Sequence, residues 1–171
     1  ALWSQPCMPI RNGLLSRADN RFANSSFLTK DGKMPDAPCL NTGYVQVYTG
    51  NGKGKTTAAL GQALRAAGAG LHVFIAQFVK GMHYSELDII GKLSPSIVLK
   101  QYGRDCFIFN DPCQADHLKA REGLDEVTAL VASGTYDLVI LDEINIATHY
   151  KLISVDSVLE IIRNKPQHVE L

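Results

Sequence analysis

The stretch VYTGNGKGKTTAALG, at residues 47–61, has the composition of a phosphate-binding loop. Its alternating glycines let successive main-chain N–H groups point into one concavity, its lysines add positive charge, and a threonine hydroxyl suits Mg²⁺. The residues that would do this are Gly50, Gly52, Lys53, Gly54, Lys55 and Thr56. A glycine-rich turn that merely precedes a helix is the alternative interpretation.

The spacing of this loop is unusual. The common phosphate-loop motif has four residues between its first glycine and the Gly-Lys pair. That rule requires a glycine at position 49, where the chain has Thr49, and the nearest glycine is Gly50. The sequence therefore predicts a nucleotide site and leaves open whether the loop supports ordinary ATP hydrolysis.

Two acids, Asp142 and Glu143, follow the apolar run LVIL. A carboxylate at the C-terminal tip of a buried parallel strand faces the same edge of the sheet as a phosphate loop and can hold a hydrated Mg²⁺. The candidate metal ligands are thus Thr56, Asp142 and Glu143, and the candidate catalytic residues are Lys55, Thr56 and Glu143. Two solvated acids in a turn are the alternative, and the sequence does not decide which acid contacts the metal.

Two further pairs of residues could contact a ligand. In QFVKG (77–81), Gln77 and Lys80 stand at the end of an apolar run, where either could meet phosphate or sugar or lie in a surface loop. Phe107 and Phe109 are two residues apart in the polar segment GRDCFIFNDP. In an extended loop both rings would point to one side. They could then form an aromatic surface for a flat ligand, or simply cover the edge of the sheet.

Strands and helices alternate along residues 43–171. The expected strands are 44–49, 72–78, 97–102 and 137–143, with 168–171 as the start of one more strand that is cut short. The expected helices start at Lys55 and stop at Gly68, span 85–91, run along a face from Ala120 to Val131, and follow a Ser154 cap over 155–162. Near-continuous apolar strands indicate a mostly parallel sheet. The sequence therefore predicts an α/β fold of P-loop, RecA-like architecture, with helices on both faces and ligands at the carboxyl ends of the strands.

Composition narrows the classes of partner. Lys plus Arg equals Asp plus Glu at 17 each, so no net field favours nucleic acid or an anionic membrane. No apolar run approaches the ~20 residues of a membrane span. The four cysteines form no CxxC pair, which favours reduced thiols in a cytoplasmic protein.

The chain divides into two unequal parts. Residues 1–42 have no sustained apolar period and are expected to be a poorly ordered or non-native extension. Their basic, acid-poor character is also weakly similar to that of an organelle transit peptide. Residues 43–171 are expected to form the nucleotide-binding domain, incomplete at its C-terminus.

The segments TGNGKGKTTAALGQALRAAGAG, QFVKG, GRDCFIF and VILDEI occur in an order that resembles the P-loop ATP:corrinoid adenosyltransferases. The resemblance covers residues 43–171 and includes the shifted loop itself. It implies transfer of the 5′-deoxyadenosyl group of ATP to the Co(I) of a corrinoid, with release of triphosphate, in adenosylcobalamin biosynthesis or salvage. It also implies that ATP lies reversed relative to ordinary P-loop enzymes, with the γ-phosphate deep in the loop and C5′ toward the corrinoid.

By matching positions, the resemblance implies that the residues from Asn51 to Thr57 hold the triphosphate. It implies that Thr56 and Glu143 serve Mg²⁺ or Mn²⁺. The partners implied are a corrinoid, an electron-donating flavoprotein reductase and a second copy of the chain in a homodimer. Phe107 matches a corrin-contacting aromatic of the family, and so does Phe109, although Trp is frequent at the second position.

Two other functions fit parts of the sequence. An ordinary RecA-like ATPase or kinase would use Glu143 to polarise water or a substrate hydroxyl. A nucleotide-binding regulatory module would bind ATP without turnover. Adenosyl transfer needs no general base because Co(I) is already a strong nucleophile, and the sequence motifs do not point to one.

Overall fold

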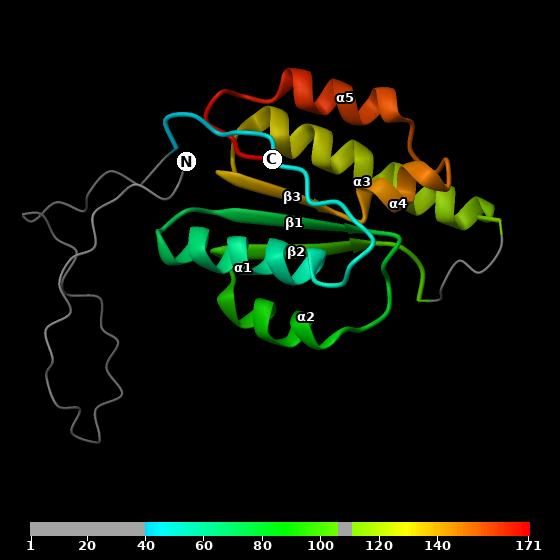
Figure 1. The fold of residues 1–171 in the computed structure, drawn as a ribbon, viewed down its shortest axis with the longest axis horizontal. Coiled ribbons are helices and arrows are strands. Elements are labelled where there is room, and N and C mark those ends of the chain that lie inside the picture. The colour runs from blue at the N-terminus through cyan, green and yellow to red at the C-terminus, as the bar shows by residue number, and fades with distance from the viewer. Residues whose placement is uncertain (1–39, 106–110) are drawn as a thin grey trace, which may run out of the picture. The chain divides into compact units, whose positions relative to one another are not determined.

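The structure is a computed structural model that describes residues 40–105 and 111–171 (Figure 1). Its described part is an α/β fold with a parallel sheet in the strand order β2-β1-β3. The strands are β1 (Val73–Phe78), β2 (Ile97–Tyr102) and β3 (Leu138–Asp142). Each falls within a predicted apolar run, and the central strand β1 is buried along its whole length. The predicted fold class is confirmed.

Helices cover both faces of the sheet, as predicted (Figure 1). Side chains alternate across β1, so that Val73 and Ile75 pack against α1 and α2, whereas Phe74 and Phe78 pack toward α3, α4 and α5. The helices are α1 (Lys55–Gly68), α2 (Ser85–Ile90), the 3₁₀ helix η1 (Gly91–Leu93), α3 (Gln114–Ser133), α4 (Ile144–His149) and α5 (Val155–Asn164). Ser154 caps α5 as expected, since its side chain accepts a hydrogen bond from a main-chain N–H in the first turn at 3.0 Å.

The strand predicted over residues 44–49 is wrong, because no regular strand forms there. Tyr44 and Gln46 make one pair of main-chain hydrogen bonds to Leu171, of 2.9 and 2.8 Å, in the pattern of a parallel ladder. Gly43 also donates a main-chain hydrogen bond to Gln167 at 2.8 Å, but these contacts do not form a regular ladder. The strand start predicted at 168–171 is likewise limited to a single parallel bridge between Glu170 and Leu138 of β3.

This pairing still sets the position of the phosphate loop relative to the sheet. Residues 170–171 lie between β3 and the segment that leads into the loop. The loop segment and β3 are therefore not direct neighbours.

The N-terminal extension, the cysteines and the helices were each the subject of a prediction from the sequence. The predicted extension 1–42 falls mostly on residues 1–39, which lie outside the described residues. Cys113 is a free cysteine, and the other cysteines lie outside the described part. Within the described residues, the helices are all too short or too polar to cross a membrane.

Candidate functional site

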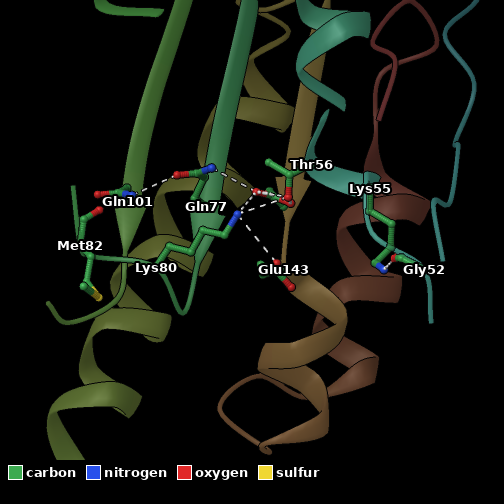
Figure 2. Close-up of polar contacts among 9 residues, drawn as sticks. Gly52, Lys55, Thr56, Gln77, Lys80, Met82, Gln101 and Glu143 are labelled. Carbon is green, nitrogen blue, oxygen red and sulfur yellow. Dashed lines mark hydrogen bonds and ion pairs between the residues drawn. The ribbon is translucent and has the colours of Figure 1, made fainter. Parts of the chain in front are cut away.

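The phosphate loop leads directly into the N-terminus of α1. Gly54, the N-cap residue, has a φ of 106° and Gly50 has a φ of 135°, a region that strains residues with a side chain. The ammonium group of Lys55 donates hydrogen bonds to the carbonyl oxygens of Gly50 and Gly52, both at 2.7 Å. Lys55 therefore folds back along the loop (Figure 2), where it adds a positive charge to the N-terminal end of the helix dipole.

A row of polar side chains crosses the C-terminal ends of the strands (Figure 2). The register places Gln77 opposite Gln101 on one side and opposite Asp142 on the other. Gln101 Nε2 donates to Gln77 Oε1 at 3.0 Å, and Gln77 Nε2 donates to Asp142 Oδ2 at 3.1 Å. Gln77 is fully buried on β1, so its amide orients the Asp142 carboxylate. Contact of Gln77 with phosphate or sugar stays a prediction.

The Asp142 carboxylate faces the first turn of α1. Thr56 Oγ1 lies 3.1 and 3.3 Å from its two oxygens, and Asp142 is 9% exposed. The neighbouring acid, Glu143, leaves the strand with a φ of 61° and becomes the N-cap residue of α4. Of the two acids that the sequence left open, Asp142 is therefore the one that contacts Thr56.

Lys80 completes this cluster of side chains (Figure 2). Its Nζ donates to Asp142 Oδ2 at 2.8 Å and to Thr56 Oγ1 at 3.3 Å, and it lies 3.8 Å from Glu143 Oε1. The ring centroid of Tyr84 is 5.7 Å from the same nitrogen, within the range of a cation–π contact. A positively charged group thus lies among the side chains predicted to be metal ligands.

Tight main-chain packing fixes the direction from which Lys80 enters the site. Val79 has a φ of 59°, which is strained for a β-branched residue. A Cβ atom on Gly81 would meet the carbonyl oxygen of Arg104 at 2.4 Å, and one on Gly103 would meet the main-chain nitrogen of Lys80 at 2.5 Å. The loops after β1 and β2 therefore touch where only glycine fits. Sequence reasoning missed this contact, although glycines follow both strands.

The donor set of this cluster suits a hard divalent cation. Within residues 40–105 and 111–171, no group of three or more His, Cys, Asp or Glu side chains could hold a metal. The oxygens of Thr56, Asp142 and Glu143 are nevertheless the ligand type that Mg²⁺ prefers, and Mg²⁺ completes its octahedron with water and phosphate oxygens. The Lys80 ammonium already stands among them as a cation. The residues present therefore fit Mg²⁺ bound together with a phosphate ligand.

A cavity of about 630 Å³ lies beside the loop. The loop from Gly50 to Thr57 forms one wall, Asp142 and Glu143 lie at another, and Tyr48 adds an aromatic surface. The volume is within the range of small-molecule sites, which is about 300–1,000 Å³. The predicted phosphate and metal ligands thus share one cavity.

An ion pair joins the two ends of the segment that carries the predicted aromatic pair. Arg104 Nε and Nη2 donate to the carboxylate of Asp116 at 2.7 and 3.1 Å, and the main-chain N–H of Cys113 donates to it at 2.9 Å. The guanidinium hydrogen bond is the main cause that lowers the pKa of the buried Asp116 carboxyl. Phe107 and Phe109 lie outside the described residues. Their contact with a ligand stays a prediction, whereas the ion pair was not foreseen from the sequence.

Comparison with known proteins identifies the family of this chain. The family model described as ATP:corrinoid adenosyltransferase BtuR/CobO/CobP matches residues 41–171. The corrinoid adenosyltransferase of Pseudomonas aeruginosa is 34% identical over 130 residues, which is 74% of this chain and 64% of that protein. The corrinoid adenosyltransferase of Escherichia coli K12 is 33% identical over 126 residues, 72% of this chain and 63% of that protein.

A protein of Nostoc sp. PCC 7120, named "Uncharacterized protein all2391", is 36% identical over 144 residues, 77% of this chain and 38% of its own length. The chain thus spans less than two thirds of the length of these relatives. The family model nevertheless covers the whole described domain, from before the phosphate loop to Leu171. The chain belongs to the ATP:corrinoid adenosyltransferase family.

Proposed function

We propose that the protein transfers the 5′-deoxyadenosyl group of ATP to the Co(I) of a corrinoid and releases triphosphate. The observation that supports this most directly is that the shifted phosphate loop, Thr56 and Asp142 line one cavity, while Lys80 donates hydrogen bonds to Asp142 and Thr56. That arrangement offers positive charge and main-chain donors to a whole triphosphate.

This reaction requires that the reacting atoms be positioned and that the charge of the leaving group be stabilised. Co(I) attacks C5′, the Co–C bond forms while the C5′–O bond breaks, and the electron pair of the broken bond leaves with the triphosphate. Cobalt supplies both electrons of the new bond and is formally oxidised to Co(III). The protein must therefore hold C5′ in line with cobalt and stabilise the negative charge that grows on the leaving group. Lys53, Lys55, the loop amides and Lys80 are the groups that would do so.

A divalent cation, Mg²⁺ or Mn²⁺, is proposed to accompany the triphosphate. Thr56 and Asp142 would hold it, directly or through water, with Glu143 nearby. When bound, such an ion neutralises charge on the phosphate oxygens.

The corrinoid side of the reaction is also proposed. Phe107 and Phe109 would contact the corrin ring, and the Arg104–Asp116 ion pair joins the described residues on either side of them. A flavoprotein reductase would supply the electron that converts Co(II) to Co(I). A homodimer is the proposed assembly.

The nature of the products tests this function. The protein is incubated with MgATP and a chemically reduced corrinoid, with a corrinoid-free reaction as the control. We expect triphosphate and adenosylated corrinoid in equal amounts, and neither in the control. ADP with phosphate, or a phosphorylated acceptor, would instead indicate an ordinary ATPase or kinase that uses Glu143. Tight binding of ATP without any product would indicate a regulatory module.

A further inference from the structure

The Lys80 ammonium contacts two of the side chains, Thr56 and Asp142, that would hold a divalent ion. Its Nζ contacts Asp142 Oδ2 at 2.8 Å and Thr56 Oγ1 at 3.3 Å, and those two oxygens contact each other at 3.3 Å. Glu143 Oε1 is 3.8 Å from the same nitrogen. Three oxygen-bearing side chains that suit Mg²⁺ therefore surround one ammonium group.

The charge of this cluster explains why a cation is needed there. Asp142 is 9% exposed, and its other partners are the neutral amide of Gln77 and the neutral hydroxyl of Thr56. A buried carboxylate without a compensating charge is strongly disfavoured. In the absence of a metal, Lys80 supplies that charge. When a divalent ion binds beside Asp142, the ammonium group would instead be repelled at short range.

The side chain and main chain of Lys80 differ in their freedom to move. The main chain is held between the strained Val79 and the glycine contact of Gly81 with Arg104, so it cannot withdraw. The lysine side chain has four rotatable bonds, and its Nζ can move several ångströms while the main chain stays in place. A triphosphate in the adjoining loop offers the ammonium group new oxygen partners.

We propose that Lys80 is an internal cation that competes with the divalent ion for Asp142 and Thr56 and moves to the triphosphate when ATP and the divalent ion bind. This inference deepens the proposed function and rests on it for the identity of the nucleotide. Lys80 therefore disfavours binding of the metal alone and makes the metal and ATP bind cooperatively. By linkage, each raises the affinity for the other by the same factor.

Metal binding in the absence of any corrinoid tests the proposal. Free Mn²⁺ is measured by electron paramagnetic resonance during titration of the wild type and of Lys80→Met, first without nucleotide and then with ATP. Without nucleotide, we expect Lys80→Met to bind Mn²⁺ at least about tenfold more tightly than the wild type, because a close positive charge is gone. The ratio of Mn²⁺ affinities with and without ATP should fall by at least about tenfold in the variant.

Further variants separate the charge of Lys80 from other effects of the substitution. Lys80→Arg keeps the charge and should retain the weak nucleotide-free binding of the wild type. Lys92→Met removes an exposed lysine on η1 and should leave both affinities unchanged. Adding Asp142→Asn to Lys80→Met should abolish the gained Mn²⁺ affinity, because the freed carboxylate is the ligand. Lys80→Gln, which keeps a hydrogen-bond donor for Asp142, replaces Lys80→Met if the latter does not fold.

The result that overturns the proposal is a folded Lys80 variant whose nucleotide-free affinity for Mn²⁺ equals or falls below that of the wild type. That result would mean that the charge of Lys80 does not compete with the metal for Asp142. The proposed function fails by a different measurement. If the wild type forms no adenosylated corrinoid while the Mn²⁺ affinities change as expected, the adenosyl transfer is wrong and the role of Lys80 stands.

Discussion

Replacing Arg104 with methionine tests whether its ion pair with Asp116 holds the segment between β2 and α3. Methionine keeps much of the length of the side chain and removes the donors. Asp116 is 6% exposed and would keep the main-chain hydrogen bond from Cys113. Removing one partner of a fully buried ion pair costs about 3–5 kcal/mol. The Arg104 side chain is 36% exposed, so water can hydrate the carboxylate in the variant and the loss should be nearer to ~2 kcal/mol.

A loss of that size is readily measured by thermal and urea unfolding at about pH 7. A loss of 1 kcal/mol in the free energy of unfolding lowers the melting temperature of a chain of this size by about 2–4 °C, so the variant should melt about 4–8 °C lower than the wild type. If the segment presents the corrin-contacting residues, the KM for the corrinoid should rise more than kcat falls. Arg104→Lys should recover part of both effects, because it restores the charge but not the bidentate geometry.

The pH dependence of this loss gives a second check. The Arg104 hydrogen bond is the main cause that lowers the pKa of the Asp116 carboxyl in the folded protein. A carboxyl whose pKa is lower in the folded state than in the unfolded state stabilises the folded state. This contribution is fully present above the pKa of the carboxyl in the unfolded state, which is about 4. That contribution is lost as the pH falls through the folded-state pKa. The difference in unfolding free energy between wild type and variant should therefore be full at neutral pH and shrink below about pH 4.

A matched ion pair on the same helix serves as the control. In α3, Arg121 Nε lies 3.0 Å from Asp125 Oδ1, and the two side chains are 73% and 62% exposed. Arg121→Met should cost no more than about 0.5 kcal/mol. Equal losses in Arg104→Met and Arg121→Met, or a difference that does not change between neutral and acid pH, would refute the reasoning.

Three further changes have outcomes that follow directly from the geometry. Gly81→Ala should lower the melting temperature and weaken ATP binding, because the added Cβ would lie 2.4 Å from the carbonyl oxygen of Arg104. Gly91→Ala is the control in both assays, since nothing lies within 4 Å of a Cβ added there. Lys55→Met should weaken ATP binding by at least about tenfold in calorimetry while the melting temperature stays close to that of the wild type, since this lysine is exposed. Ser154→Ala should cost about 1 kcal/mol in urea unfolding without changing ATP affinity, because it removes the cap of α5, whose hydrogen bond is 3.0 Å long.

The strands and long helices could be predicted because their sequence signals are local. The apolar runs that became β1, β2 and β3 are bounded by polar or glycine-containing turns, and the apolar period predicted from Ala120 to Val131 follows the buried face of α3. The segment 44–49 has the same composition as a strand, yet it forms none, because a strand depends on its neighbours and the main-chain hydrogen bonds of this segment to Leu171 do not extend into a regular ladder. The helix α4 was not predicted; it starts directly after β3, where Glu143 is its N-cap residue.

In the candidate site, too, local motifs could be predicted and contacts between distant residues could not. The phosphate loop could be predicted because its glycines and lysine are consecutive in sequence. The contact of Lys80 with Asp142 joins residues 62 positions apart and depends on the left-handed conformation of Val79, which is rare for a β-branched residue. No local signal indicates such a conformation. The same holds for Arg104 and Asp116, whose contact depends on where β2 ends and α3 begins.

The choice between Asp142 and Glu143 is a case where more could have been inferred. Successive residues of a strand point to opposite faces of the sheet. Leu138 and Ile140 of β3 pack on the face that α1 covers, so Asp142 points toward α1 and Thr56 by the same alternation. This alternation does not continue to Glu143, because its φ of 61° ends the strand and Glu143 becomes the N-cap residue of α4. Once the sequence had placed the helix that follows the phosphate loop on the face of Leu138, parity alone would have selected Asp142 as the partner of Thr56.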